Sequence, residues 1–429
     1  MNITIFSLLL NRYPIWKAKK YFEKIKHLKF DELNQLNIEK RTQIVEYHRK
    51  HTSFYKEKTT NDWEWDKLPV LKKQDIQIAL KERLSNQFTI KQCYTNKTSG
   101  STGDPFYFAK DKFSHALTWV NIEDKFNTHS LFGKKQARFY GLPKDKIVRY
   151  KERIKDYFSN RYRFDVFDLS NEALESWLVN FTKNKYVYIN GYTTVIVVFA
   201  KFLLSKKITL KSVCPSLKAC VVTSEMCSAS DRKTLEEAFG VRVINEYGAS
   251  ELDLIAFEDE NFDWVINNET LFVEILDDNN LPVEFGEKGK IVISSLYNKA
   301  HPFIRYEIGD IGVLQKKGNK IILKELVGRK EDLIYLPSGK VAPGLTFYYV
   351  TKSIMEDTDN IKEIKVVQTK INEFEIEYTS KEILKENQIE NIKTALLSYL
   401  EPNLKLNFKR LEKLERSKSG KLKQFKSLL

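Results

Sequence analysis

Apolar positions recur at helical spacing through residues 15–57, where tyrosine, leucine and isoleucine alternate with lysine. This periodicity predicts helices for the N-terminal part of the chain. Before them, "ITIFSLLL" (residues 3–10) predicts a buried strand or the start of a helix, with contact to a membrane surface as the alternative. The run is too short to span a bilayer, so no transmembrane segment is expected there. "LPVLKKQDI" (residues 68–76) predicts a turn that leads into another helix.

The middle of the chain carries a strand–helix–strand pattern. "LKACVVTSE" (217–225) is a continuous apolar run, as expected of a strand buried on both faces. "SASDRKTLEEAFG" (228–240) has a Ser/Asp start signal and a glycine stop, so a helix is expected, and "VRVINEYGASE" (241–251) predicts a second strand. A unit of this length implies a parallel pair with a right-handed crossover. The polar ends of both strands are therefore expected at one sheet edge, where open α/β sheets bind ligands.

The pattern changes to alternation from about residue 264. Hairpin strands are predicted for "LFVEILD" (271–277), "GKIVISSL" (289–296) and "IGVLQKKGNKIILKELVG" (311–328). After Gly328 a smaller unit follows, with a hairpin over 361–379, an amphipathic helix over 381–400 and a strand over 403–414. The sequence thus predicts an α/β protein with two domains, 1–328 and 329–429, the second of them a small α+β module.

Composition narrows the class only a little. The chain has 429 residues and 42% hydrophobic residues, which fits a folded protein of two or more domains. Its four cysteines form no CxxC pair, so free thiols in a reducing cytoplasm are expected. The net charge of +14 fits anionic small molecules or an acidic membrane surface as well as nucleic acid. Because the lysines are scattered rather than clustered, nucleic-acid binding is the weaker alternative, and we expect no nucleic-acid partner.

Candidate chemistry begins with "KTSGSTGDPFYF" (97–108). A loop rich in glycine, serine and threonine can offer backbone N–H groups and hydroxyls to phosphate oxygens. The Walker P-loop is excluded, because no GK[ST] occurs in the chain. The nucleophile elbow G-x-S-x-G is also missing, since Ser99 stands where its first glycine belongs. An ordinary polar turn is the alternative interpretation.

Four further segments add candidate side chains. "NEYGASE" offers Tyr247, whose ring suits a purine, and Glu251, whose carboxylate suits Mg²⁺. "PFIRYEIGD" places Asp310 at a strand end, where it can accept hydrogen bonds from a ribose diol. "GRKED" and "RSKSGK" supply Arg329 with Asp332 at the junction of the two units, and Lys421 near the C-terminus. Taken singly, each of these residues also fits a capping or surface role.

Taken in order, the motifs resemble the adenylate-forming superfamily of acyl-CoA synthetases, specifically its phenylacetate–CoA ligase/CapK-like branch. "TSGSTGDP" resembles the family's phosphate loop, "TSE" and "NEYGASE" its adenine and magnesium loops, and "RYEIGD" its ribose loop. "GRKED" resembles its hinge and "RSKSGK" its catalytic-lysine loop, so the resemblance covers nearly the whole chain. It implies a large N-terminal domain of mixed, mostly parallel sheets packed with helices, a β-rich subdomain, and a small mobile C-terminal lid.

The resemblance also implies a role for each matching residue. Lys421 and Glu251 would be catalytic, Glu251 as the Mg²⁺ ligand, and Asp332 would sit at the hinge. The phosphate loop would be formed by Thr98, Ser99, Gly100, Ser101, Thr102 and Gly103. The rest of the nucleotide site would be formed by Ser224, Glu225, Asn245, Glu246, Tyr247, Gly248, Ala249, Ser250, Asp310 and Arg329. The chain departs from the family at Asp104, where many members carry lysine, and at Glu307-Ile308, which replaces an Arg-Thr type pair.

The activity implied by the resemblance is ATP-dependent activation of a carboxylic acid as an acyl-adenylate. The acyl group would then pass to the thiol of CoA, or, as the alternative, to an amine of an amino sugar or amino acid in surface-polysaccharide biosynthesis. ATP and Mg²⁺ are the expected cofactors. The protein is expected to be a cytoplasmic homodimer, and peripheral association with a membrane is left open. Tyr140 and Tyr192 are candidates for the acyl pocket, with Tyr188 as a third.

Overall fold

The computed structural model describes residues 3–98, 106–141, 146–166, 170–329, 333–339, 341–343, 360–415 and 425–429. Ser99, Gly100, Ser101, Thr102 and Gly103 of the predicted phosphate loop lie outside these residues, as do Asp332 and Lys421. What the sequence implies for those seven residues therefore stays a prediction.

The N-terminal part is helical, as the periodicity predicts. It contains α1 (Ile3–Leu10), α2 (Ile15–Ile25), α3 (Phe30–His51) and α4 (Ser53–Glu57), followed by a short helix, α5 (Leu80–Arg83). The apolar run at the start forms helix α1, so the start of a helix, one of the two predicted alternatives, is confirmed, and the buried strand is not. Ile5 is buried, but Phe6 and Leu10 are exposed. Next come a hairpin of β1 (Tyr94–Lys97) and β2 (Tyr107–Lys110), and helix α6 (Lys112–Thr128).

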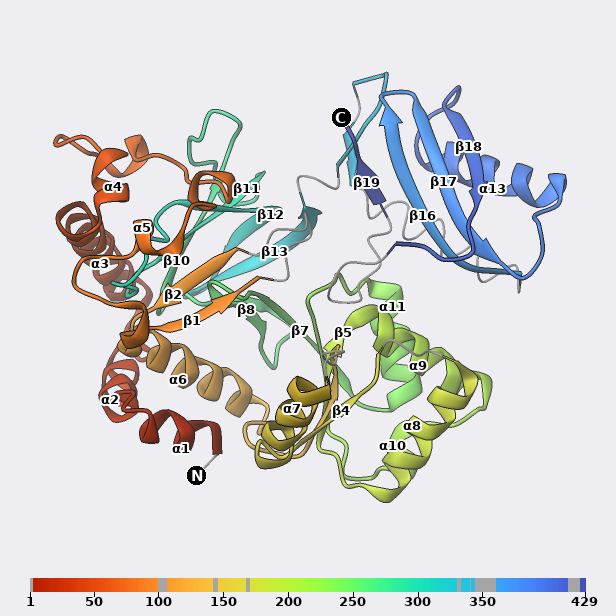
Figure 1. Ribbon diagram of the computed structural model, residues 1–429, viewed down its shortest axis with the longest axis horizontal. Helices are drawn as coiled ribbons and strands as arrows, with labels where there is room; N and C mark the ends of the chain where they lie inside the picture. The colour runs from red at the N-terminus through yellow and green to blue at the C-terminus, as the bar shows by residue number, and fades with distance from the viewer. Residues whose placement is uncertain are drawn as a thin grey trace.

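A large mixed sheet forms the centre of the protein (Figure 1). In the described part of the chain it has eleven strands, in the order β10-β11-β12-β13-β9-β8-β7-β6-β5-β3-β4. Its parallel half contains β3 (Gln136–Phe139), β4 (Arg161–Phe164), β5 (Tyr188–Tyr192), β6 (Ala219–Thr223) and β7 (Arg242–Ala249). The helices of this half are α7 (Lys146–Phe158), α8 (Asn171–Lys183), α9 (Thr193–Ser205), α10 (Leu210–Val213) and α11 (Ala229–Phe239).

The predicted crossover β6–α11–β7 is confirmed, because its start and stop signals are local. The Ser228 hydroxyl accepts a hydrogen bond from the backbone N–H of Asp231 at 3.0 Å and so caps α11. Gly240 ends the helix in the left-handed region, with φ +65°. Leu235 and Phe239 from α11 join the core formed with β5 and β6.

The other half of the sheet is antiparallel and carries a second core. It contains β8 (Asp253–Glu258), β9 (Trp264–Ile266), β10 (Leu271–Leu276), β11 (Lys288–Ser295), β12 (Tyr306–Lys317) and β13 (Lys320–Arg329). The hairpin predicted over 311–328 is the β12–β13 pair. Ile44 and Tyr55 from α3 and α4 pack with Ile291 and Ile293 of β11 in this second core.

The C-terminal residues build a separate sheet with its own core (Figure 1). After β14 (Leu333–Tyr335) and β15 (Val341–Pro343) come β16 (Ile361–Lys370), β17 (Glu373–Ser380), α13 (Glu386–Tyr399), β18 (Lys405–Arg410) and β19 (Phe425–Ser427). The sheet order is β18-β17-β16-β19, and β17–α13–β18 forms a parallel crossover. Val366, Phe374 and Leu396 lie in a core that, among the described residues, is made only of residues from this unit. The predicted hairpin, helix and strand are therefore confirmed.

Two further observations concern the whole described chain. All four cysteines are free; Cys214 and Cys220 are buried, whereas Cys93 and Cys227 are partly exposed. No helix among the described residues is both long and apolar enough to cross a lipid bilayer.

Candidate active site

The candidate side chains gather at one edge of the parallel half of the sheet. Tyr140 follows β3, Tyr192 ends β5, Ser224 and Glu225 follow β6, and the segment 248–251 lies at the end of β7. These strands are parallel neighbours, with Gly191 opposite Val222 and Thr223 opposite Glu246. Their carboxyl ends therefore meet at the same edge, as the sequence predicts.

Tyr247 and Asp310 connect two motifs that are 63 residues apart. The Tyr247 hydroxyl donates a hydrogen bond to Asp310 Oδ2 at 2.6 Å. Gly309, before Asp310, has φ +89°, a conformation that favours glycine. Arg329 stands opposite Asp310 in the register of β12 and β13. The structure thus brings Tyr247 and Asp310 together and places the backbone of Arg329 opposite Asp310. Tyr247 is only 8% exposed, and the stacking of its ring on a base stays a prediction.

Ser224 and Glu225 lie in the turn after β6. Ser224 is exposed and has φ +68°. Glu225 Oε2 accepts hydrogen bonds from the backbone N–H and the hydroxyl of Thr194, at 2.9 and 2.8 Å. Because Thr194 lies in the first turn of α9, this carboxylate is stabilised by the helix N-terminus and fixes the β6 turn against α9.

Asn245 and Glu246 lie within β7, and their bonds hold that strand in the sheet. Glu246 Oε1 accepts a hydrogen bond from the Thr223 hydroxyl at 3.0 Å, and burial raises the pKa of Glu246. The Asn245 N–H donates to Glu258 Oε2 at 2.7 Å, and Arg232 donates to the same oxygen at 2.6 Å. These contacts give both residues a structural role in the sheet, and a direct role at a nucleotide stays a prediction.

Glu251 lies in the loop between β7 and β8 and is 8% exposed. Its Oε1 accepts a hydrogen bond from the Tyr306 hydroxyl at 3.1 Å, and burial raises the pKa of its carboxyl group. Within the described residues, no group of three or more Asp, Glu, His or Cys side chains is placed to hold a metal ion. Mg²⁺ binds proteins through one or two carboxylates plus substrate phosphates. A single carboxylate such as that of Glu251 suits this ion, and Mg²⁺ binding there stays a prediction.

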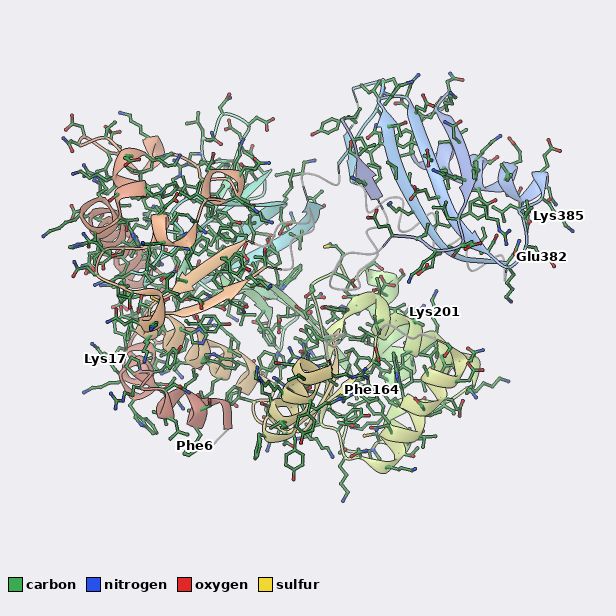
Figure 2. The ribbon with its side chains drawn as sticks, in the orientation of Figure 1. Phe6, Lys17, Phe164, Lys201, Glu382 and Lys385 are labelled. Carbon is green, nitrogen blue, oxygen red and sulfur yellow. The ribbon has the colours of Figure 1, made fainter. Side chains whose placement is uncertain are left out.

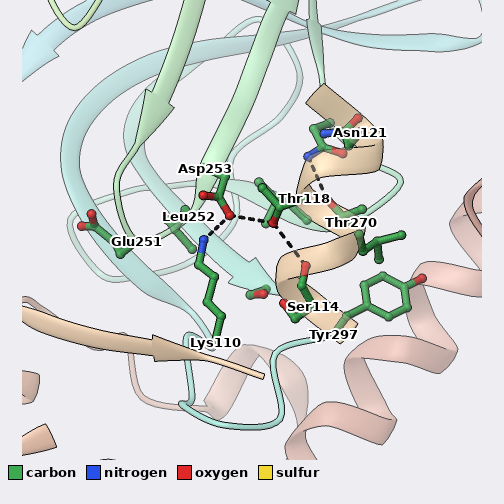
Figure 3. Close-up of a pocket in the computed structure, with 13 residues that line it drawn as sticks. Lys110, Ser114, Thr118, Asn121, Glu251, Leu252, Asp253, Thr270 and Tyr297 are labelled. Atoms are coloured by element: carbon green, nitrogen blue, oxygen red, sulfur yellow. Dashed lines mark hydrogen bonds and ion pairs between the residues drawn. The ribbon is translucent and has the colours of Figure 1, made fainter. Parts of the chain in front are cut away.

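A network behind Glu251 was not foreseen from the sequence (Figure 3). Lys110 from β2 forms an ion pair with Asp253, and the Thr118 hydroxyl from α6 donates to Asp253 Oδ2 at 2.7 Å. Asp253 has φ +62° and stands two residues after Glu251. The adjoining cavity of about 20 Å³ is large enough for one ordered water. A charged residue inside the apolar run "FYFAKD" was the only sequence signal for Lys110.

The base of the predicted phosphate loop is closed by Thr98 and Phe106. The Thr98 N–H donates to the Phe106 carbonyl at 2.9 Å, and the Phe106 N–H donates to the Thr98 hydroxyl at 3.3 Å. The paired strands β1 and β2 lead into and out of the loop. Since Lys110 is in β2, this hairpin connects the loop directly to the network behind Glu251.

Comparison with known proteins identifies the fold. No protein-family model matches this chain. Protein CapK of Staphylococcus aureus is 23% identical to it, over 94% of this chain and 91% of CapK. A 2-hydroxyisobutyryl-CoA ligase in the postadenylation state superposes with a TM-score of 0.65 at 14% identity, over 92% of this chain and 89% of that chain. The amide bond synthetase McbA from Marinactinospora thermotolerans gives 0.52 at 13% identity, over 76% and 66%.

The chain has the fold of the adenylate-forming ligases. The predicted α/β architecture is confirmed, and the chain is similar in fold to ligases of the superfamily that its six motifs resemble. In this fold the β6 and β7 ends, Tyr247, Asp310 and Glu251 lie in one region of the large sheet.

The acyl-pocket candidates occupy different places in the adenylate-forming fold. The rings of Tyr140 and Tyr192 lie 4.9 Å apart between centroids, at the ends of adjacent strands, and Arg138 lies 4.1 Å from the Tyr140 ring. Tyr188 is 7% exposed and packs against Phe126 in the core. The structure therefore favours Tyr140 and Tyr192 over Tyr188, and pocket lining stays a prediction.

Proposed function

We propose that this protein is an AMP-forming ligase that activates a carboxylic acid with ATP and passes the acyl group to the thiol of CoA. The observation that carries the proposal is the hydrogen bond between Tyr247 and Asp310, which joins two motifs with nucleotide chemistry at the sheet edge. The adenylate-forming fold supports the same reaction. We also propose that the protein is a cytoplasmic homodimer, and this part of the proposal rests on the sequence resemblance alone.

The chemistry requires charge neutralisation. In the first step a carboxylate oxygen of the acid bonds to the α-phosphorus of ATP, and the bond from that phosphorus to pyrophosphate breaks. Because both reactants are anions, the loop from Thr98 to Gly103 would supply N–H donors and Lys421 a positive charge as the transition state forms. Glu251 would hold Mg²⁺, which supplies further positive charge when it is bound. Removing one preorganised donor typically raises such a barrier by roughly 2.7–4 kcal/mol.

We further propose that residues 1–328 and 329–429 act as two domains, with Asp332 at the hinge and Lys421 used only in the first step. The separate sheet and core of the C-terminal unit support this division. The 2-hydroxyisobutyryl-CoA ligase gives a TM-score of 0.65 in its postadenylation state and 0.55 in its thioesterification state. The same fold thus differs in arrangement between the two steps in that enzyme, as a moving lid requires.

The acceptor of the acyl group has a second candidate. The amide bond synthetase McbA has the same fold as the CoA ligase, so an amine acceptor is compatible with this chain. The likeness to CapK, together with the sequence resemblance, favours an amino sugar or amino acid in surface-polysaccharide biosynthesis for this alternative.

The decisive experiment is carboxylate-dependent exchange of pyrophosphate into ATP, measured across aromatic, fatty, hydroxy and amino acids. At least one acid should support exchange that requires Mg²⁺ and is lost in Asp310→Ala. Repeating the successful acids with CoA and with amines then identifies the acceptor. No exchange with any acid, combined with no heat of binding for magnesium-ATP by calorimetry, contradicts the proposal.

A further inference from the structure

Helix α7 carries five apolar and aromatic side chains on the outside. The side chains are spaced three or four residues apart and so form one stripe along the helix. They are Ile147 (68% exposed), Tyr150 (69%), Ile154 (41%), Tyr157 (80%) and Phe158 (58%). A helix on a globular protein normally turns such a stripe toward the core. Here the side chains of the stripe are exposed, on a helix that packs against β4, the strand at one edge of the large sheet (Figure 1; Figure 2 adds the side chains in the same view).

The polar face of α7 is the one that packs on the protein. Asp156 is 2% exposed and accepts two hydrogen bonds from the guanidinium of Arg163 on β4, both at 3.0 Å. Glu152 accepts a third from Arg163 at 3.1 Å, and Arg153 donates to the Arg163 carbonyl at 2.7 Å. Turning the apolar stripe inward would leave these buried charges without partners, so the outward orientation is fixed by ion pairs.

The charges around the stripe have one dominant sign. Arg149, Lys151 and Lys155 are exposed on α7, whereas its two acidic residues, Glu152 and Asp156, are engaged by Arg163. Lys155 also pairs with Glu152 at 2.7 Å, and Arg149 with Asp165 at 3.5 Å. The outer face of α7 is therefore apolar and aromatic, with basic flanks.

We propose that this outer face of α7 is a docking surface for a membrane with anionic lipids. A helix with lysine and arginine beside an aromatic and aliphatic stripe lies in the plane of a lipid interface, with the stripe among the acyl chains. Tyrosine suits that position, because its ring is apolar and its hydroxyl reaches water. The basic flanks complement anionic headgroups, and the net charge of +14 adds long-range attraction. None of the residues of this surface is a candidate residue of the adenylation site, so the inference stands independently of the proposed ligase activity.

The test is co-sedimentation of the full-length protein with vesicles of phosphatidylcholine, with or without phosphatidylglycerol. The wild type should bind the anionic vesicles, bind neutral vesicles much more weakly, and lose binding as salt is raised. The variant Ile147→Ser/Tyr157→Ser should lose at least about tenfold in affinity. Lys151→Glu should lose roughly 25-fold, because it changes the charge near the anionic leaflet by two units and each unit contributes about fivefold. Matched controls are Ile371→Ser/Ile383→Ser and Lys381→Glu, exposed positions in the C-terminal unit that should bind as the wild type does.

Several results would overturn the inference. These are a wild type that ignores anionic vesicles, an α7 variant that binds as well as its controls, and binding that is equal on neutral vesicles. A dimer in solution that Ile147→Ser/Tyr157→Ser abolishes, without vesicle binding, would assign the face to a second copy instead. Thermal unfolding of each variant verifies the fold, and the salt and lipid dependence of the wild type tests the inference without any variant.

Discussion

At the scale of single residues, the Tyr247 hydroxyl orients the Asp310 carboxylate. This bond joins β7 to β12, which are not neighbours in the sheet, and it places a carboxylate beside the strand ends. A hydrogen bond to an ionised group contributes roughly 1.5–3 kcal/mol, more than one between neutral groups. An oriented carboxylate is what recognition of a ribose diol requires.

Two substitutions of Tyr247 separate the contribution of its hydroxyl to ATP binding from that of its ring. Tyr247→Phe should weaken ATP binding by about 1.5 kcal/mol, roughly tenfold, because Asp310 loses a donor while the packing against Trp264 remains. Tyr247→Ala should weaken it further if the ring also contacts the base. Calorimetric titration with magnesium-ATP measures both. Unchanged affinity in Tyr247→Phe would show that Asp310 is oriented by other groups.

Lys110 is expected to hold the loop that carries Glu251. Lys110→Met removes the ion-pair partner of Asp253 and leaves it the hydrogen bond from Thr118, and the free energy of unfolding should fall by about 2–3 kcal/mol, since Lys110 is buried but Asp253 is partly exposed. The Mg²⁺ concentration needed for half-maximal pyrophosphate exchange should rise at least about threefold, because Glu251 lies two residues from Asp253.

A double-mutant cycle provides the control for Lys110. Lys110→Arg should restore part of the Mg²⁺ response, and Lys110→Met/Asp253→Asn should cost less than the sum of the single substitutions. A loss of stability with an unchanged Mg²⁺ requirement would limit Lys110 to folding alone.

At the scale of elements, the sequence predicted those helices and hairpins whose ends are set by local signals such as caps and turns. The cap at Ser228 and the stop at Gly240 fixed α11, and the Gly-Asn turn fixed the β12–β13 hairpin. The bond from Tyr247 to Asp310 depends on the register of several strands that pair far apart in sequence, so only the family resemblance pointed to it. The exposed stripe of α7 could not be foreseen, because periodicity identifies an apolar face without showing which way it points.

Helix α3 contains a histidine that should make stability depend on pH. His48 is fully buried; its Nε2–H donates to the Asn298 carbonyl and its Nδ1 accepts from Thr52, both at 2.9 Å. Burial lowers the pKa of His48 to about 4 from 6.5. The unfolded chain therefore takes up this proton first as the pH falls, so the contribution of neutral His48 is complete above pH 6.5 and is lost toward pH 4.

The measurement compares the wild type with His48→Gln by urea denaturation. Between pH 8 and pH 5, protonation of His48 should cost the wild type about 2 kcal/mol that the variant does not lose. Buried carboxyl groups such as Glu274, whose pKa is raised by burial, act in the opposite direction but are common to both proteins. His27→Gln controls for the loss of an exposed imidazole. Parallel pH curves for the wild type and His48→Gln would refute the assignment.

At the scale of the whole molecule, the proposed reaction needs residues from both units. The C-terminal unit would supply Lys421 for the first step and withdraw it before the second. The large sheet holds Tyr247, Asp310 and Glu251, whereas Lys421 belongs to the C-terminal unit, which has a core of its own. An acyl-adenylate must be shielded from water and then exposed to an acceptor. A lysine on a separate unit can leave the site between these two events.

The division of labour is tested by Lys421→Ala. Lysine is a compact charge on a flexible stem, suited to the α-phosphate, and its loss should slow adenylation by roughly 10²–10³-fold. Formation of the thioester or amide from supplied acyl-adenylate should stay within about twofold of the wild type, since the proposed second step does not use this charge. Lys418→Ala, three residues earlier, removes the same charge from the same segment and should leave both steps unchanged. Single-turnover assays of each half-reaction separate the two effects, and equal losses in both would place Lys421 in general folding or docking of the unit.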